Sequence, residues 1–373
     1  MNIFRAYKFR LYPNEKQKEM IHKTFGCTRL VYNHFLDIRQ KEYKNTSKNK
    51  SPYKCLKELT DLKREYVFFK EVDSQSMQAV IFDLDNAYTR FFNGAGFPKF
   101  ICKGWHDSYK INNVKNEYKG RHYENIRLDL KNRIITLPKL KQVKIKGYRN
   151  EKYIIGDIKS ATISRETNKY FVSVLVEEPF FRKPITPKSI VEIDLGIKDM
   201  IVMSYNEKIQ NTVKVNEKRL KGLSRCQKGS KNRYKLKLKI QRLYLKIKNS
   251  RKHLIHNITN KLLKDNDIIV CENLDIKNMY EKHSIAKCLN QIPLGEIINT
   301  LKYKAQWQGK QVIQIDRYYP SSQVCSVCDY KNEKVKDLNV RKWECPKCHT
   351  YHNRDVNASV NIMFEELKNI WKA

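Results

Sequence analysis

Four cysteines near the C-terminus restrict the fold of this chain more than any other feature. They stand as Cys325-x-x-Cys328 and Cys345-x-x-Cys348, with sixteen residues between the two pairs. Two such knuckles supply four thiolates, which close a tetrahedron around Zn²⁺ in a zinc ribbon. A rubredoxin-like iron site uses similar knuckles and is the alternative. Because four protein ligands leave no open position, we expect structural zinc that shapes a surface and does not itself perform chemistry.

The remaining cysteines indicate a reducing compartment. They are scattered singly, which predicts buried, small apolar side chains; these are Cys27, Cys55, Cys102, Cys226, Cys271 and Cys288. No stretch approaches the roughly 20 apolar residues that cross a bilayer. The first residues, Met1 to Arg5, lack the apolar core of a signal peptide. We therefore expect a cytoplasmic protein with no transmembrane segment and no membrane partner.

The charge balance indicates a polyanionic partner. The 373 residues include 75 Lys and Arg against 39 Asp and Glu, a formal net charge of +36. Such an excess of like charge repels itself and attracts polyanions. A typical protein on a short DNA duplex makes only roughly 6–10 phosphate contacts, so the excess suits a folded RNA together with DNA. A ribosomal-type basic protein would have a similar composition.

The N-terminal half changes its periodicity twice. Residues 3–11 alternate in polarity, which predicts a strand with a basic face. Apolar residues then follow helical spacing over 20–35 and 77–91, so residues 12–117 are predicted to form a helical unit. From about 120 to 180 the period is two again, which predicts an antiparallel sheet or barrel that the first strand completes.

Beyond residue 187 strands interleave with helices, a pattern typical of an α/β domain. Residues 190–203 are predicted to form a strand, a tight turn and a strand, and further strands are predicted at 267–272 and 311–316. Before the strand at 267–272, fifteen of the thirty-five residues from 218 to 252 are Lys or Arg and none is acidic. Leucines and isoleucines within that stretch follow helical spacing, which predicts a long amphipathic helix. We expect phosphate contacts here, with Lys228, Lys231 and Arg233 as candidates, although a solvated face is the ordinary alternative.

Three acids occupy positions suited to divalent ions. Asp194 lies in an apolar strand, Glu272 ends another, and Asp355 falls in the first turn of a predicted helix. Two-metal phosphodiester cleavage needs carboxylates that converge on ions roughly 3.5–4 Å apart, and Mg²⁺ prefers oxygen ligands. The two aspartates also have ordinary explanations, since Asp beside Gly forms turns and Asp at a helix start is a cap. Pattern alone leaves both interpretations open.

Several motifs resemble the TnpB family, the nucleases encoded by many insertion sequences. The first RuvC motif of that family resembles DLGIK at 194–198, the second ENL at 272–274, and the third RDVNA at 354–358. Four further segments are similar: 320–328 at the zinc ribbon, 227–233 in the basic stretch, 26–33 in a helix-turn-helix-like segment, and 138–140 in a barrel. The resemblance runs almost end to end. One departure is Asp329, where the family usually has Gly after the second cysteine.

This resemblance implies a multidomain α+β protein. It implies an RNase H-like RuvC α/β nuclease domain, 188–320 plus 351–373, into which the zinc ribbon, 321–350, is inserted. It also implies an antiparallel wedge β-barrel, 1–11 plus 118–183, into which a helical recognition lobe, 12–117, is inserted.

The function that the resemblance implies is RNA-guided cleavage of DNA by a protein encoded in a transposable element. Asp194, Glu272 and Asp355 would be catalytic and hold Mg²⁺ or Mn²⁺. The implied partners are a guide RNA transcribed from the end of the element and double-stranded target DNA beside a short flanking motif. In such systems base pairing reads the sequence, while the protein reads duplex shape and the flanking motif.

Three alternatives remain at this point. A compact type V CRISPR effector shares the layout of RuvC domain and zinc ribbon, but the short chain favours TnpB. An RNA-guided repressor without cleavage is disfavoured because all three acids are present. A transposase in the strict sense would need strand-joining chemistry, for which no serine or tyrosine nucleophile motif stands out.

Overall fold

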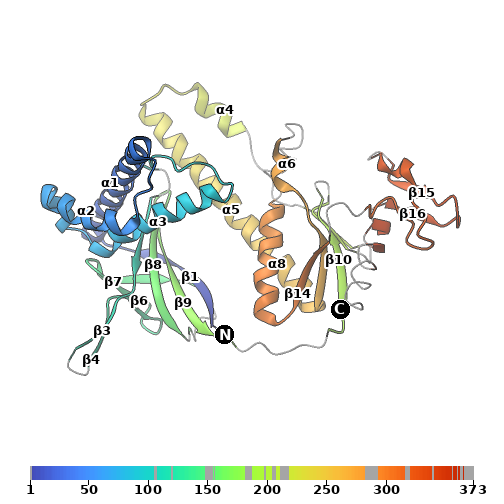
Figure 1. Cartoon of the computed structure of the whole chain (residues 1–373), viewed down its shortest axis with the longest axis horizontal. Coiled ribbons are helices and arrows are strands. Elements are labelled where there is room, and N and C mark those ends of the chain that lie inside the picture. Colours follow the sequence, from blue (N-terminus) through green and yellow to red (C-terminus); the bar gives the residue numbers. More distant parts are fainter. Residues whose placement is uncertain are drawn as a thin grey trace. The chain divides into compact units, whose positions relative to one another are not determined.

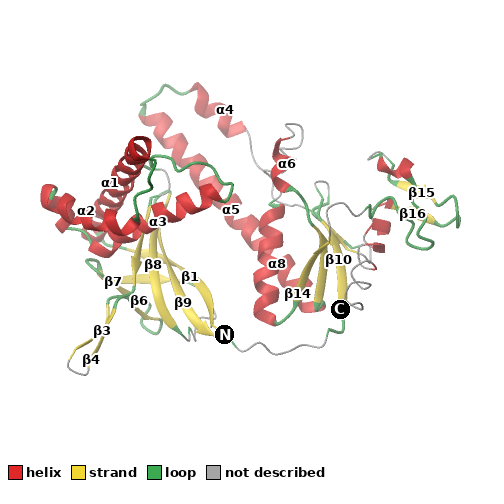
Figure 2. Cartoon of the chain, viewed as in Figure 1, coloured by secondary structure: helices red, strands yellow, loops and turns green. Residues whose placement is uncertain are grey.

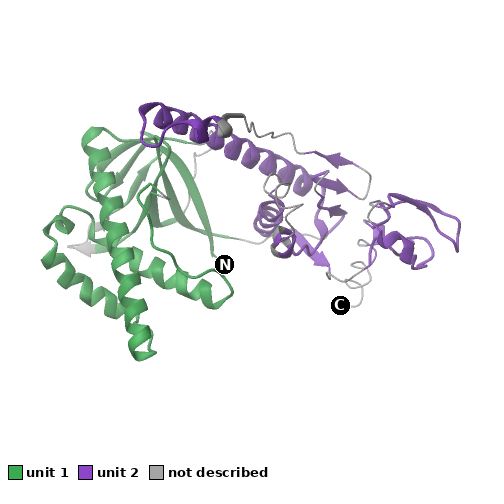
Figure 3. Cartoon of the chain, turned by 90° about the horizontal axis from the view of Figure 1, so that it is seen from above, with its two compact units in different colours: residues 1–180 green, residues 181–373 purple. Residues whose placement is uncertain are grey.

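The structure is a computed structural model (Figure 1). It describes residues 2–104, 107–118, 121–147, 154, 156–180, 187–196, 199–203, 207–210, 218–281, 293–315, 320–337, 340–354, 356–358, 360, 361 and 364. The chain divides into two compact units, Met1–Phe180 and Phe181–Ala373 (Figure 3).

A seven-stranded antiparallel sheet forms the centre of the first unit (Figure 2). Its strands, in spatial order, are β2 (Ser108–Asn112), β8 (Asp157–Glu166), β9 (Lys169–Pro179), β1 (Asn2–Tyr12), β7 (Lys141–Lys146), β6 (Ile134–Leu137) and β5 (Arg127–Asp129). A separate hairpin pairs β3 (Lys115–Tyr118) with β4 (Arg121–Glu124). The first strand of the chain lies between β9 and β7, which confirms that it completes the sheet. Alternate residues of β1 and β9, among them Phe9 and Val174, are buried in one core.

Three α-helices complete the first unit: α1 (Glu15–Thr46), α2 (Pro52–Glu65) and α3 (Ser74–Phe92), with the short 3₁₀ helix η1 (Val67–Lys70) before α3. A capping box begins α1, because the Asn14 side chain accepts from the amide of Gln17 while the Gln17 side chain accepts from the amide of Asn14. The side-chain Nε2 of Gln17 also donates to the carbonyl oxygen of Leu140, at 2.9 Å. This contact joins the start of α1 to the turn between β6 and β7.

Residues 26–33, which resemble a helix-turn-helix-like segment, lie inside the single helix α1. Nothing lies within 4 Å of a Cβ built at Gly26, and the buried Thr24, Thr28, Val31 and Phe35 keep helical spacing across it, so the helix continues. In addition, β2 belongs to the sheet although it falls within the range assigned to the helical unit.

The second unit contains a mixed five-stranded sheet. Its order is β12 (Lys208–Ile209), β11 (Ile201–Met203), β10 (Ile190–Asp194), β13 (Ile268–Glu272) and β14 (Gln311–Ile315). The strands β10, β13 and β14 are parallel, while β11 and β12 are antiparallel to their neighbours. The three strands predicted from apolar runs are therefore confirmed.

Two long helices cover one face of this sheet. They are α5 (Lys231–Asp265) and α8 (Leu294–Gln308). Two shorter helices lie nearby in the sequence: α4 (Lys218–Arg225) precedes α5, and α6 (Ile276–Glu281) follows β13. Val191, Ile193, Ile269 and Cys271 share a core with apolar residues of α5 and α8. The alternate strand residues form a second apolar cluster, which strand geometry assigns to the opposite face of the sheet. The predicted amphipathic helix over the basic stretch is confirmed as α5.

The prediction of burial for the single cysteines is partly wrong. Cys27, Cys55 and Cys271 are buried, but Cys102 is exposed and Cys226 is only half-buried. Cys102 lies in the segment after α3, where loop backbone leaves side chains at the surface, and Cys226 lies at the corner between α4 and α5. Cys288 falls outside the described residues.

Among the helices that the structure describes, none combines the length and the apolar character that crossing a membrane requires.

A buried lysine joins α8 to α5. The Lys304 ammonium donates to the His256 carbonyl at 3.1 Å, to the Thr259 hydroxyl at 2.8 Å and to the Asn260 side-chain oxygen at 2.7 Å. Burial lowers the pKa of Lys304 to about 8. Between pH 8 and 10.5, therefore, the unfolded chain binds more protons than the folded chain, and stability rises with pH.

We predict that the wild-type free energy of unfolding rises between pH 8 and 10 relative to a Lys304→Met variant. Over these two pH units the difference should not exceed about 2.7 kcal/mol, because one pKa unit corresponds to about 1.36 kcal/mol. Urea denaturation at several pH values would measure it. Lys302→Met, on the exposed side of the same helix, is the control and should keep the wild-type rise. Parallel curves for wild type and Lys304→Met would contradict the prediction.

Candidate active site and metal centre

Two of the three predicted acids lie at the same edge of the mixed sheet. Asp194 is the last residue of β10 and Glu272 the last of β13. The strands are parallel and Ile193 pairs with Cys271, so each acid directly follows a paired residue. Ile193 and Cys271 face α5 and α8, and strand alternation directs both acids to the other face. Each acid is half-buried at the carboxyl end of its strand, where α/β sheets commonly bind ligands.

A serine from a distant segment contacts one of these carboxylates. The Ser321 hydroxyl donates to Glu272 Oε1 at 3.1 Å, and Ser321 is buried with only 4% of its surface exposed. This hydrogen bond restricts the orientation of the Glu272 carboxylate. Ser321 is not among the site residues predicted from the sequence, although it lies in the segment 320–328 at the start of the predicted zinc ribbon.

The turn that contains Ser321 is held by two asparagines near the C-terminus. The Asn361 amide donates to the carbonyl oxygens of Ser321, at 2.7 Å, and Val324, at 2.6 Å. Asn357 donates to the same Val324 carbonyl at 2.6 Å and accepts from the amide of Ser326 at 3.0 Å. Both asparagines are almost fully buried.

The third predicted acid, Asp355, lies outside the described residues. The residues next to it are described: 356–358 are helical, and the Arg354 guanidinium donates to the carbonyl oxygen of Asp337 at 2.8 Å. Met363, Leu367 and Ile370, part of the apolar stripe predicted for this helix, also lie outside the described residues.

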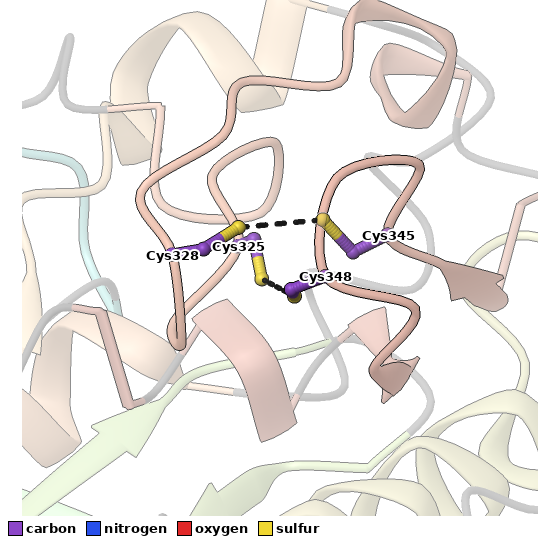
Figure 4. Close-up of side chains that lie close together, drawn as sticks. All are labelled: Cys325, Cys328, Cys345 and Cys348. Atoms are coloured by element: carbon purple, nitrogen blue, oxygen red, sulfur yellow. Dashed lines mark hydrogen bonds between the residues drawn. The ribbon is translucent and has the colours of Figure 1, made fainter.

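The four clustered cysteines converge on one point, as Figure 4 shows. Their sulfur atoms all lie within 4.8 Å of one another, with Cys325 to Cys348 and Cys328 to Cys345 both at 3.5 Å. A disulfide would bring two sulfurs to about 2.05 Å. Tetrahedral zinc, with Zn–S bonds of about 2.3 Å, places its sulfurs roughly 3.8 Å apart. The cluster therefore fits a tetrahedral metal ion and is not a pair of disulfides.

Both knuckles have the same backbone geometry. The amides of Cys325 and Cys345 donate to the carbonyls five residues later, at 2.8 and 3.0 Å, and their carbonyls accept from the amides of Asp329 and His349. Asp329 has φ 58° and His349 φ 56°, in the left-handed region. Glycine adopts that region most readily, and Asp is among the few other residues that tolerate it. This geometry explains why the knuckle accommodates Asp329 in place of Gly.

Neighbouring residues change the pKa of one clustered cysteine and contact the sulfur of another. Hydrogen bonds from the hydroxyl and amide of Thr350 lower the pKa of Cys348 to about 6, which favours the thiolate that binds metal. His352 Nε2 lies 3.1 Å from the Cys325 sulfur, and its ring packs on Trp343 with the centroids 4.8 Å apart. Burial lowers the pKa of His352, so this ring is neutral near pH 7. Such contacts orient metal ligands in the way that second-layer hydrogen bonds do.

The three basic candidates differ in their surroundings. Lys228 and Lys231 are exposed at the corner between α4 and α5. Arg233 is half-buried, and its Nη1 donates to the carbonyls of Leu223 and Cys226, at 2.7 and 2.9 Å. These carbonyls end α4, so Arg233 caps that helix. The two lysines are the better candidates for phosphate contacts, because their ammonium groups face solvent.

Comparison with known proteins matches most of the chain in three parts. The family model described as "Helix-turn-helix domain" of IS605 OrfB matches residues 1–48. The IS605 OrfB model described as "Probable transposase" matches 171–283, and "Cas12f1-like, TNB domain" matches 295–362.

Two bacterial relatives match nearly end to end. A "Putative RNA-guided DNA endonuclease" of Streptomyces pristinaespiralis is 30% identical over 97% of this chain and 89% of its own length. The "Putative RNA-guided DNA endonuclease InsQ" of Escherichia coli K12 is 30% identical over 97% of this chain and 92% of its own length. Among solved structures, a Cas12f1–sgRNA–target DNA complex is similar over 96% of this chain and 98% of that chain, at 16% identity and a TM-score of 0.33.

We predict that the purified chain holds about one zinc ion through its four clustered cysteines. Cys345→Ser should lose most of this zinc and destabilise the region around the ribbon, because metal binding is coupled to local folding. Elemental analysis would measure the metal content. Cys102→Ser, which changes an exposed cysteine elsewhere, should keep the full zinc content. A chain without zinc, or with a red iron chromophore, would contradict the assignment.

Proposed function

Because this chain belongs to the TnpB family of IS605-type RNA-guided DNA endonucleases, we propose that it cuts target DNA at a site formed by Asp194, Glu272 and Asp355. The observation that carries this proposal is the parallel pairing of β10 with β13, because it ends both strands in a carboxylate at one sheet edge. A guide RNA would direct the cut, and double-stranded DNA would be the substrate.

Each residue of the proposed site has a separate role. Asp194 and Glu272 would hold Mg²⁺ or Mn²⁺, since carboxylate oxygens suit these hard cations. A divalent cation there supplies positive charge at the phosphodiester group that is cut. Ser321 would keep the Glu272 carboxylate oriented. Asp355 would complete the site from the segment next to Asn357.

The proposed architecture follows the same family. The mixed sheet with α5 and α8 on one face is the proposed RuvC domain of RNase H-like fold, 188–320 plus 351–373, and the cysteine cluster is a zinc ribbon within it, 321–350. The seven-stranded sheet is the proposed wedge barrel, 1–11 plus 118–183, to which the structure adds β2. The helices α1, α2 and α3, within the predicted range 12–117, would form the recognition lobe.

The proposed division of labour separates affinity from chemistry. Affinity would come from base pairing with the guide and from lysine and arginine contacts with phosphates, which the net charge of +36 supports. The carboxylates contribute little to binding, because phosphate contacts position a nucleic acid without needing metal. Loss of cutting with retained binding is therefore the signature of this site.

We predict that Asp194→Ala, Glu272→Ala and Asp355→Ala each reduce DNA cleavage by more than about a hundredfold, since losing even an outer-layer partner costs about 10–100-fold. Combining two of them should add little, because the acids act as one unit. Plasmid cutting with the co-purified guide RNA and Mg²⁺ would measure activity. A gel shift on the same target should show nearly unchanged binding.

Two variants sharpen this test. Glu207→Gln changes an acid that pairs with Lys261 and is not one of the acids that end β10 and β13. This variant should cut like wild type. Ser321→Ala keeps all three acids but removes the hydrogen bond to Glu272, so it should reduce cutting partially and raise the Mg²⁺ concentration required. If Asp194→Ala still cuts, the proposed site is wrong. If Asp194→Ala loses target binding as well, the acid has a structural role.

We further predict that replacing Lys228 and Lys231 with Ala flattens the salt dependence of RNA binding by about one unit of slope for each lysine. Fluorescence anisotropy over a range of salt concentrations would measure it. Arg233 is left intact in this variant, because its contacts with α4 would confuse structure with binding. Lys23→Ala with Lys41→Ala, two ion-paired lysines of α1, is the control and should keep the wild-type slope. An unchanged slope in the Lys228 and Lys231 variant would mean that this corner is only a solvated face.

A further inference from the structure

A cluster of exposed aromatic side chains follows the end of α3. Phe92 is 73% exposed, Phe97 45% and Phe100 47%. The rings of Phe92 and Phe97 are linked through Phe91, whose centroid lies 5.3 Å from that of Phe92 and 5.1 Å from that of Phe97, and Phe100 follows three residues after Phe97. Tyr88 contacts Phe97 edge-on at 5.8 Å. We call Phe92, Phe97 and Phe100 the aromatic shelf.

The backbone beneath the shelf is held in place. The amides of Gly94 and Ala95 donate to the carbonyls of Phe91 and Arg90, at 3.0 and 2.9 Å, and end α3 with Gly94 at φ 88°. On the far side of the shelf, the Asn33 side chain accepts from the Ile101 amide at 2.8 Å and donates to the Ile101 carbonyl at 3.0 Å.

Pro98, between two exposed phenylalanines, is buried. The rings are therefore kept at the surface by a fixed backbone, and rigid exposed apolar surface of this kind usually has a partner.

The charges around the shelf indicate which partner. Arg90, Lys99 and Lys103 are exposed, and residues 86–104 include no acid. Lysine is depleted in protein–protein interfaces. Cations interleaved with exposed aromatic rings are the arrangement that binds single-stranded nucleic acid, because rings stack on bases while cations contact phosphates.

We propose that the aromatic shelf binds unpaired bases of a single-stranded nucleic acid by stacking. The inference rests on the proposed function, since it takes a nucleic-acid partner as given, and it adds a site that lies outside the carboxylates and the basic corner. The strand could belong to an RNA or to a DNA strand freed from its duplex. Both offer the same chemistry, a base face beside a phosphate.

The test uses the full chain, freed of co-purifying nucleic acid, with short oligo(U) and oligo(dT), which have little structure of their own. The Phe92→Leu and Phe100→Leu double variant keeps apolar bulk but removes the ring faces. It should bind about tenfold more weakly, the effect expected for lost stacking. Its salt dependence should match wild type, because stacking releases no counterions. Phe92→Tyr with Phe100→Tyr should restore wild-type affinity, and Tyr43→Leu, an aromatic of α1 with 59% exposure, is the control.

The outcomes distinguish RNA from DNA as the ligand, and base stacking from packing of the shelf within the protein. A loss confined to oligo(U) identifies RNA as the ligand, and one confined to oligo(dT) identifies DNA; equal losses support stacking with both. Wild-type affinity in the leucine variant overturns the proposal. If that affinity is unchanged while the unfolding temperature shifts, the shelf packs within the protein and the proposal is equally overturned. Failure of the wild-type chain to bind either oligonucleotide would count against the proposed function itself.

Discussion

Two parallel strands end in carboxylates, and the arrangement of the second unit follows from their pairing. A parallel pair brings the carboxyl ends of both strands to one sheet edge. Strand pairing alone therefore places Asp194 and Glu272 at the same edge. The same pairing requires a long crossover connection. That connection includes α5, and α5 buries the opposite face together with α8. Apolar burial on one face of the strands therefore leaves the acids on the other.

The cysteine ribbon is connected to this edge through Ser321. Its hydroxyl contacts Glu272, and its backbone carbonyl accepts from Asn361 beyond the ribbon. The ribbon thus begins and ends at the same place, next to the proposed site. Since metal binding and folding are coupled in such small modules, zinc would support the geometry of the carboxylate edge without touching the DNA. Under the proposed function, zinc would have a structural role and the divalent cation at the carboxylates would take part in the reaction.

The basic residues show what a sequence pattern can and cannot predict. Fifteen cations without an acid predicted a charged helix face, and α5 has that face. The pattern could not distinguish Arg233 from Lys228 and Lys231, because all three carry the same charge in one short run. The structure distinguishes them, since Arg233 donates to the carbonyls that end α4 while the lysines are exposed. Cys102 shows the same limit, because residue type predicted burial and the loop after α3 exposes it.

The sequence by itself determined those features whose physics is local. Apolar runs determined β10, β13 and β14, helical spacing determined α1, α3 and α5, and the spacing of two short knuckles determined the four-cysteine cluster. Only the tertiary structure decided which distant groups meet. Ser321 and Glu272 are separated by 49 residues and Asn361 and Ser321 by 40, and no periodicity links them. Such contacts arise because buried polar groups must find partners wherever the chain packs, and packing is a property of the whole fold.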